Sequence, residues 1–369
     1  MKNNIYIFFL FVFFNSLGVI SSAQAKKTDT TQYFKPILSY TADAGRNFSG
    51  GIAPGNTYMG LIDAGWQFLI PRGTNNCEFL LEFQSSHGHN LTKHYIGDLQ
   101  VISNIENRKS LYFYQFYYKH HFKKGFLAFG LQDLNLEFVM NESGGDLTNS
   151  SFGIPAIFPL NFTVSIYPKN ALALTGGYRF SEAVIVRAGI WDGDAGSLDD
   201  DPYNTDWTIN KTQGLLGITE AEIHINPSAQ TLKLGGYVHT ADFDSPDTLD
   251  LSYSKGSWGG YLLYDIQINE KLGAFAQAGI MPEKYSYNPL YLGTGISTHL
   301  FNQRTEDALS LGAAYIHLFD NRYECDIEMN YKFVFMKNFS VRPCLHYIIS
   351  PSGTLPDAFA SFLRITAEL

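Results

Sequence analysis

The residue-by-residue alternation of side-chain character constrains this chain more than any other feature of its sequence. Between residues 219 and 226, Thr, Ala, Ile and Ile alternate with Glu, Glu, His and Asn. The same alternation recurs in residues 183–191, 231–240, 261–268 and 323–335, with Leu263 as an exception. Successive side chains of a β-strand point to opposite faces of the sheet, so this period predicts strands whose two faces meet different surroundings.

Composition and hydropathy limit what those surroundings can be. Charged residues make up 17% of the chain, against roughly 25% in an average soluble domain. After residue 25 no apolar stretch approaches the roughly 18 residues that a membrane-spanning helix needs, which excludes a helical membrane protein. Both a water-soluble β-sandwich and a membrane barrel remain compatible with the alternation, because each has one apolar and one polar face.

The lengths of the connections favour the barrel. Short polar turns stand at residues 123–125, 181–182 and 269–271, whereas residues 193–214 and 239–256 form long connections rich in Gly, Asp, Asn and Ser. Short periplasmic turns at one end and longer extracellular loops at the other are typical of outer-membrane barrels. An open sheet edge would leave backbone groups unpaired in hydrocarbon, so the barrel must close.

The length of the chain gives the size of this barrel. At about 20 residues for each strand and its connection, the 344 residues after Ala25 predict about 16 strands. We therefore expect an all-β fold, a transmembrane antiparallel β-barrel. The lumen of a barrel of this size is an aqueous channel rather than a packed core.

The first 25 residues have the features of a cleaved export signal. Lys2 precedes an apolar run over residues 5–14, and Ala23-Gln24-Ala25 offers a cleavage site after Ala25. Asn15 and Ser16 interrupt the run, which argues against an uncleaved anchor. We predict a barrel domain over residues 26–369, in which residues 26–40 form a short lead segment, in the outer membrane of a Gram-negative bacterium.

Several other functions find little support in the sequence. The net charge of −9 argues against nucleic acid as a partner. Three scattered cysteines give neither a disulfide framework nor a zinc site. The histidines at 87, 89 and 94 lack further metal ligands, and the aspartates from 192 to 201 lack the spacing of a calcium loop. We expect neither a cofactor nor a bound metal, and no nucleophile signature of a barrel enzyme is found.

Motifs in order along the chain resemble those of the carbohydrate-selective outer-membrane porins of the OprB type. In the first half these are residues 40–51 (YTADAGRNFSGG), 65–66 (GW), 130–138 (GLQDLNLEF), 151–153 (SFG), 167–168 (YP) and 191–194 (WDGD). In the second half they are residues 234–240, 259–265, Gly293 through Arg304 to Asp307, Glu328 through Tyr331 to Arg342-Pro343, 350–353 and Arg364. The final residue, Leu369, departs from the aromatic residue that usually ends such barrels.

The resemblance implies a barrel of about 16 strands that lets monosaccharides and small oligosaccharides diffuse passively across the outer membrane. The implied partners are small sugars, outer-membrane lipid and lipopolysaccharide. Neither a monomer nor a homo-trimer is favoured. Two alternatives stay open at this stage: a general diffusion porin of the same architecture and an exported carbohydrate-binding β-sandwich. Detergent-free solubility would indicate the second.

Candidate sugar contacts follow from the strand parity and from the opening motif. A sugar-selective constriction needs planar charged groups for paired hydroxyls and an aromatic platform for the C–H face. Parity places six polar residues on the lumen face: Arg187, Glu220, Glu222, Lys233, Asp265 and Gln267. Trp191 shares the face of Arg187, so the two are the simplest pair of cation and platform. The opening motif adds Arg46 and Asn47, for which hydrogen bonding at a strand end is the alternative; Trp66 and Trp191 also suit interface girdles.

Overall fold

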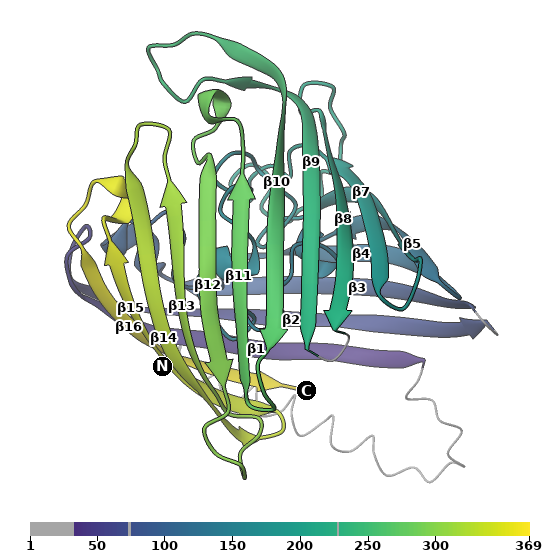
Figure 1. The fold of residues 1–369 in the computed structure, drawn as a ribbon, viewed down its shortest axis with the longest axis horizontal. Helices are drawn as coiled ribbons and strands as arrows, with labels where there is room; N and C mark the ends of the chain where they lie inside the picture. The colour runs from purple at the N-terminus through teal and green to yellow at the C-terminus, as the bar shows by residue number, and fades with distance from the viewer. Residues whose placement is uncertain (1–32, 73–74, 227–228) are drawn as a thin grey trace, which may run out of the picture.

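The fold is a closed antiparallel β-barrel of 16 strands. The computed structural model describes residues 33–72, 75–226 and 229–369. Each strand pairs with its neighbours in sequence, and β1 pairs with β16, which closes the sheet (Figure 1). The predicted closed barrel of about 16 strands is confirmed. No helix in the described ranges has the length and apolar character needed to cross a membrane.

The strands occupy most of the described chain. The first eight are β1 (Phe34–Ser49), β2 (Gly55–Arg72), β3 (Asn75–Gly88), β4 (Ser110–Phe122), β5 (Gly125–Gln132), β6 (Ala171–Arg179), β7 (Val184–Asp192) and β8 (Leu215–Asn226). The other eight are β9 (Gln230–Asp244), β10 (Tyr253–Gln267), β11 (Leu272–Ile280), β12 (Leu290–Thr298), β13 (Ala308–His317), β14 (Tyr323–Met336), β15 (Phe339–Ile349) and β16 (Ala358–Glu368). Short helical turns are η3 (Thr92–Ile96), η4 (Leu134–Leu136), α2 (Ser150–Gly153), η5 (Glu283–Tyr285) and η6 (Pro351–Gly353).

The two faces of the strands match the predicted alternation. On β7, Ile190 is 51% exposed on the outer face, whereas the next residue, Trp191, is 1% exposed on the inner face. On β8, Glu220 is fully buried inside the barrel and Ile225 is exposed outside. Leu263, the exception in its strand, points inward and joins the apolar cluster described below. The outward apolar face is the surface that meets lipid in a transmembrane barrel.

The short turns and one of the long connections lie where they were predicted, and the other long connection is shorter. Residues 193–214 join β7 to β8 as expected. Between β9 and β10 the strands continue to Asp244 and resume at Tyr253, which pairs with Asp244. The expected loop over residues 239–256 is therefore wrong in its bounds. Strand pairing does not need lipid on one face, so polar residues can extend a hairpin into water.

The beginning of the chain is partly outside the described residues. The predicted export signal, residues 1–25, lies in the range that the structure does not describe. Within the predicted lead segment of residues 26–40, β1 begins at Phe34, which pairs with Phe68 of β2. Residues 34–40 therefore belong to the barrel wall, because the hydrogen-bond register with β2 extends through them.

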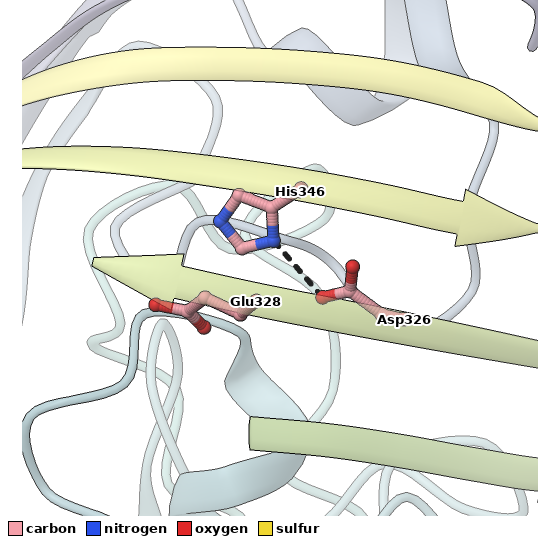
Figure 2. A group of neighbouring side chains, drawn as sticks. All are labelled: Asp326, Glu328 and His346. Carbon is pink, nitrogen blue, oxygen red and sulfur yellow. Dashed lines mark hydrogen bonds and ion pairs between the residues drawn. The ribbon is translucent and has the colours of Figure 1, made fainter. Parts of the chain in front are cut away.

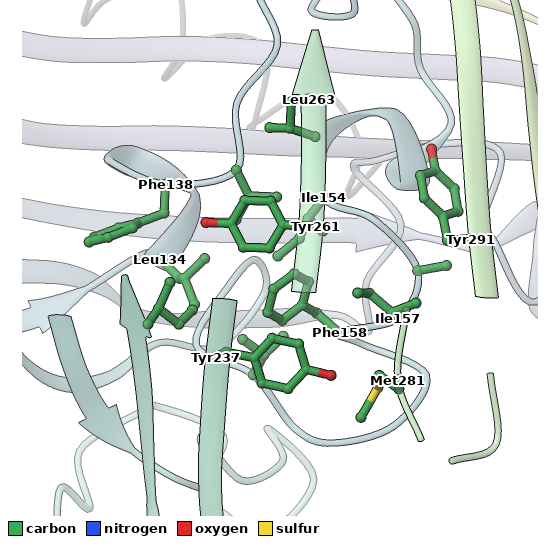
Figure 3. Close-up of a cluster of buried hydrophobic side chains, with 14 of the residues drawn as sticks. Leu134, Phe138, Ile154, Ile157, Phe158, Tyr237, Tyr261, Leu263, Met281 and Tyr291 are labelled. Carbon is green, nitrogen blue, oxygen red and sulfur yellow. The ribbon is translucent and has the colours of Figure 1, made fainter. Parts of the chain in front are cut away.

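Part of the lumen is filled by two segments of the chain. Residues 89–109, between β3 and β4, and residues 133–170, between β5 and β6, fold against the inner wall; we call them the first and second inward segments. Ile154, Ile157 and Phe158 of the second segment pack with wall residues in a buried apolar cluster (Figure 3). Phe152 belongs to the same cluster. The expectation of a lumen without a packed core is wrong for this part of the barrel.

Small residues on the wall make room for the second inward segment. A Cβ atom at Gly279 of β11 would lie 2.6 Å from Ile157 Cδ1. A Cβ atom at Gly312 of β13 would lie 2.7 Å from the ring of Phe152. Distances this short force the neighbour to shift, so these two glycines let apolar side chains of the segment reach the sheet.

A buried ion pair lies at the closure of the barrel. Asp43 of β1 stands opposite Arg364 of β16 in the strand register. Arg364 Nε and Nη2 each donate to one oxygen of Asp43 at 2.8 Å. Ser103 of the first inward segment donates to Asp43 at 2.6 Å, and Arg364 Nη1 donates to Asn104 at 2.8 Å. The pair thus joins the first strand, the last strand and the first inward segment.

Removal of one partner of this ion pair should destabilise the barrel. Asp43→Ala leaves the Arg364 guanidinium buried without its carboxylate, at a cost of about 3–5 kcal/mol. We expect a clear drop in the thermal unfolding temperature of the detergent-solubilised barrel. The change in electrophoretic mobility of the barrel after heating measures this temperature. Arg46→Ala, which removes an exposed charge from the outer face of the same strand, is the matched control. Equal unfolding temperatures for both variants would contradict a closing role.

Candidate functional site

A cluster of opposite charges lines the inner wall where β4, β7, β8 and β9 meet the second inward segment. We call it the Arg187 cluster. Its members come from β4, from the three adjacent strands β7, β8 and β9, and from the segment after η4, and they are Lys119, Glu137, Arg187, Glu220, Glu222, His224 and Lys233. The register explains the meeting of the strand residues, since Arg187 stands opposite Glu220 and Glu222 stands opposite Lys233.

Arg187 is the centre of this cluster. Its Nη1 atom donates to Glu222 Oε2 at 2.7 Å and lies 3.7 Å from Glu220 Oε1. Its Nε atom lies 3.7 Å from Glu137 Oε2, and Glu137 also pairs with Lys119. The side chain of Arg187 is 16% exposed. The guanidinium is therefore fixed in orientation by three carboxylates while part of it still reaches the lumen.

Glu222 connects the second cation to the cluster. Its Oε2 atom lies 3.7 Å from Lys233 Nζ, and its Oε1 atom lies 2.9 Å from His224 Nε2. Lys233 Nζ also donates to the carbonyl of Met140 at 2.8 Å. Planar carboxylate and guanidinium groups held in fixed positions are suited to paired hydroxyl groups of a passing solute.

Two of the predicted lumen residues hold the second inward segment. Glu220 Oε2 accepts hydrogen bonds from the Val139 backbone N–H and from the Tyr261 hydroxyl, both at 2.9 Å. Asp265 accepts from Asn141 Nδ2 at 2.8 Å and from the backbone N–H of Ser143 at 3.0 Å and of Glu142 at 3.2 Å. Both carboxylates lie on the wall of the lumen, and their hydrogen bonds give the segment its position.

A third anchor lies on β14 and β15 (Figure 2). Glu328 accepts the backbone N–H of Thr148 at 2.8 Å and of Asn149 at 3.0 Å. Asp326 accepts from Asn149 Nδ2 at 2.7 Å and lies 3.0 Å from His346 Nδ1. These hydrogen bonds hold Thr148 and Asn149 of the second inward segment against the wall.

The same three wall residues are the candidate metal ligands of this structure. Asp326, Glu328 and His346 are buried and bring one ligand atom each within 4.8 Å of one another. Their carboxylates already accept hydrogen bonds from the inward segment, so a cation would have to displace those contacts. We therefore treat the group as an anchor.

A second charged group faces the lumen from β14 and β15. Arg342 donates to the backbone carbonyl of Asp146 at 2.8 Å and to its carboxylate at 3.1 Å. Lys332 Nζ lies 3.6 Å from the same carboxylate. Asp146 belongs to the second inward segment, so this segment meets charged groups of the wall both at Glu137 and at Asp146.

The remaining sequence candidates take other positions. Trp191 faces inward, but Phe138 covers it at 5.3 Å between ring centroids, and its Nε1 donates to the Gln132 carbonyl. Asn47 is buried and donates to the carbonyls of Gly50, Ala53 and Tyr95 at the end of its strand. Arg46 is exposed on the outer face, where it contacts Asn56 and the ring of Phe48.

These placements have simple physical reasons. Trp191 is covered because the second inward segment folds over it, which strand parity cannot anticipate. Arg46 is adjacent to the inward Asn47, so the pleat turns it to the other face. Gln267 is exposed next to the turn, where it donates to the Asn269 carbonyl. Trp66 is exposed on the outer face. We therefore leave Arg46, Trp191 and Gln267 out of the sugar path proposed below.

Among the charged residues of the lumen that were absent from the sequence candidates are Lys119, Glu137, Asp146 and Arg342. Lys119 lies near the end of an aromatic-rich strand whose alternation is poor. Glu137 and Asp146 lie in the second inward segment, which has no periodicity. Arg342 stood in a matched motif, and its place on β15 could have been assigned from the parity of that strand. The positions of Lys119, Glu137 and Asp146 could be assigned only from the path of the second inward segment in the structure.

Comparison with known proteins decides the family. The sequence matches the carbohydrate-selective porin, OprB family, over residues 62–369. The chain belongs to this family. The predicted resemblance is confirmed, and the family and the fold are those of outer-membrane channels of Gram-negative bacteria rather than of enzymes. A search of curated proteins finds no match for this porin.

Solved structures show the same fold at low identity. The high-pH structure of Pseudomonas putida OprB is 18% identical, with a TM-score of 0.83, and the alignment covers 92% of this chain and 95% of that one. The low-pH structure of the same protein has a TM-score of 0.59 at 16% identity, with coverage of 92% and 93%. The channel DcaP of Acinetobacter baumannii has a TM-score of 0.59 at 9% identity, with coverage of 91% and 97%.

The first inward segment of this porin carries carboxyl groups with raised pKa values. Burial, followed by repulsion from Asp98, raises the pKa of Glu106 to about 8. Burial raises the pKa of Asp98 itself to about 6. Glu106 accepts the backbone N–H of Thr92 at 3.1 Å, and Asp98 accepts that of Ile102 at 3.0 Å. Both carboxyl groups therefore connect separate parts of the first inward segment.

The raised pKa of Glu106 predicts a loss of stability with rising pH. The folded state holds this proton up to about pH 8, whereas the unfolded chain releases it near 4.5, so stability falls as the pH rises through that window. Glu106→Gln mimics the protonated group. We expect the variant to unfold at a higher temperature than the parent at pH 8, with a smaller difference at pH 5. Glu283→Gln, an exposed change in η5, is the control.

Release of the second inward segment should widen the channel. Asp265→Ala removes three hydrogen bonds that hold residues 141–143, each worth about 1.5–3 kcal/mol because the acceptor is charged. We expect a higher and noisier single-channel conductance in planar bilayers. Glu270→Ala, in the turn after β10, should leave the conductance unchanged. A conductance equal to that of the parent would show that the segment keeps its place without Asp265.

Proposed function

We propose that this porin is a selective channel through which monosaccharides and small oligosaccharides diffuse passively across the outer membrane. The observation that carries the proposal is the Arg187 cluster, in which charged planar groups are fixed at the wall of the lumen beside the second inward segment. Membership of the carbohydrate-selective family supports the same conclusion.

The charge balance of the cluster favours neutral, hydroxyl-rich solutes. Lys119, Arg187 and Lys233 stand against Glu137, Glu220 and Glu222. Because these lysine, arginine and glutamate side chains are equal in number and paired, the cluster itself exerts only a weak net field on a small ion. A sugar hydroxyl donates to a carboxylate and accepts from a guanidinium, so it can bind both partners of such a pair.

The arrangement also suits passage rather than retention. The Arg187 cluster and the Arg342–Asp146 group lie at different parts of the wall, and each offers partly exposed donors and acceptors. Conduction needs weak binding at successive positions, so that a solute leaves as easily as it enters. The two charged groups beside the second inward segment are our candidates for such positions.

Block of ion current by sugar tests the proposal. Glucose and maltose should reduce the current through the parent channel in a planar bilayer. Arg187→Ala removes the donor that holds the cluster together, and loss of a hydrogen bond to a charged group should weaken the block about tenfold. Arg46→Ala removes an equal charge from the outer face, and sugar should block its current as strongly as that of the parent.

Two results would contradict selectivity for sugars. In the first, neither sugar reduces the current while liposome swelling admits unrelated solutes of similar size equally; this result indicates a general diffusion porin. In the second, Arg187→Ala and Arg46→Ala show the same block as the parent, which separates the Arg187 cluster from sugar binding.

A further inference from the structure

A cavity at the long-loop end of the barrel is not explained by the channel. It has a volume of about 270 Å³ and lies between the start of β6, the loop after β7 and residues 200–213. The residues of its wall that matter here are Lys169, Asn170, Asp192, Asp194, Trp207 and Gln213. None of them belongs to the Arg187 cluster.

Three residues of the cavity wall each have a buried side-chain oxygen without a hydrogen-bond donor. They are Asn170 Oδ1, Asp192 Oδ1 and Gln213 Oε1. Asn170 is 1% exposed, and its amide orientation is fixed because Nδ2 donates to the Tyr114 carbonyl at 2.9 Å. The N–H groups of Gly193 and Asp194 lie near the Asp192 carboxylate, which leaves Asn170 Oδ1 and Gln213 Oε1 as the clearest unpaired acceptors. A buried acceptor without a donor destabilises the folded protein, and a ligand with hydrogen-bond donors would offset this cost.

The geometry fits a ligand larger than a metal ion. Asp194 accepts the Gly196 N–H, and Asp201 accepts the Thr205 N–H and lies 3.3 Å from Lys169 Nζ. In the described ranges, the His, Cys, Asp and Glu ligand atoms that come together in a group of three lie on β14 and β15, away from this cavity. A calcium ion needs 6–8 oxygen ligands close around it, and these carboxylates already accept other hydrogen bonds. The cavity has room for about nine water molecules, which is more space than a single ion fills.

Trp207 gives the cavity an apolar surface. Its Nε1 atom donates to the Asn204 carbonyl at 2.8 Å, and its ring lies 6.2 Å from that of Phe113. The indole is therefore held in place by both its polar and its apolar parts. An aromatic face suits the C–H face of a pyranose, and the surrounding acceptors suit its hydroxyls. The excess of aspartates over lysine disfavours an anionic ligand.

We propose that this cavity is a docking site for one neutral pyranose unit, separate from the lumen. The unpaired acceptors bind hydroxyl hydrogens, and Trp207 supports the sugar ring. The Lys169 ammonium group can donate to a hydroxyl oxygen of the same sugar. The choice of a sugar rests on the proposed function, whereas the need for a ligand with several donors rests on the cavity itself.

Tryptophan fluorescence of the full barrel gives a specific test. Of the four tryptophans, Trp191 is buried, and Trp66 and Trp258 are exposed on the outer face, where detergent covers them. Titration with D-glucose, in a detergent without a sugar headgroup, should therefore change the emission of Trp207 and saturate. The change should be absent in Trp207→Phe and about fivefold weaker in affinity in Gln213→Met, from loss of about one hydrogen bond.

The control is Asp199→Asn, which alters the same loop but pairs with Arg108 outside the cavity and should bind like the parent. A saturating glucose response that persists in Trp207→Phe, or that is unchanged in Gln213→Met, would overturn the proposal. Saturation with calcium chloride but not with glucose would identify a cation site and also overturn it.

The current measurements separate this site from the channel. Arg187→Ala should weaken the current block but keep the glucose-dependent fluorescence change at the parent's affinity. Gln213→Met should keep the parent's current block but bind glucose about fivefold more weakly in the fluorescence titration. If glucose does not block the parent current and the fluorescence change still depends on Trp207, the proposed channel selectivity fails and the docking site stands. If the parent blocks normally and shows no fluorescence change, the docking site fails alone.

Discussion

Hydrogen bonds from the backbone of the inward segments to buried carboxylates of the wall determine the interior of this porin. Glu220, Asp265 and Glu328 accept N–H groups of the second inward segment, and Glu324 accepts those of Leu99 and Gln100 from the first. Each side needs the other, because a buried carboxylate and a buried N–H are both costly without a partner. Without these hydrogen bonds the wall carboxylates would no longer hold the two inward segments in place.

These anchors explain why the charged residues of the lumen are in fixed positions. Lys233 pairs with Glu222 and also donates to Met140 of the second inward segment, while Glu137 of that segment pairs with Arg187 and Lys119. The wall and the segment therefore build the Arg187 cluster jointly. In the function that we propose, such preorganised groups exchange water for sugar hydroxyls without a large rearrangement, which suits rapid diffusion through a selective channel.

Membership of the porin family is compatible with low overall sequence identity. A barrel keeps its architecture as long as strand period, closure and backbone pairing are satisfied, which many side-chain combinations achieve. At 18% identity the high-pH structure of Pseudomonas putida OprB shares the fold over nearly the whole chain. What such a comparison leaves to the individual chain is the set of polar residues on the inner wall.

The sequence by itself determined the barrel, its strand number and the inward face of residues such as Arg187 and Glu222, because strand parity is a local property of the chain. Only the tertiary structure decided what those inward residues contact. Trp191 has the right parity for the lumen, yet Phe138 covers it, and Asp265 anchors a segment more than 120 residues away in sequence. The path of an inward segment has no period, since it follows partners on many strands at once, so its contacts cannot be read from local alternation.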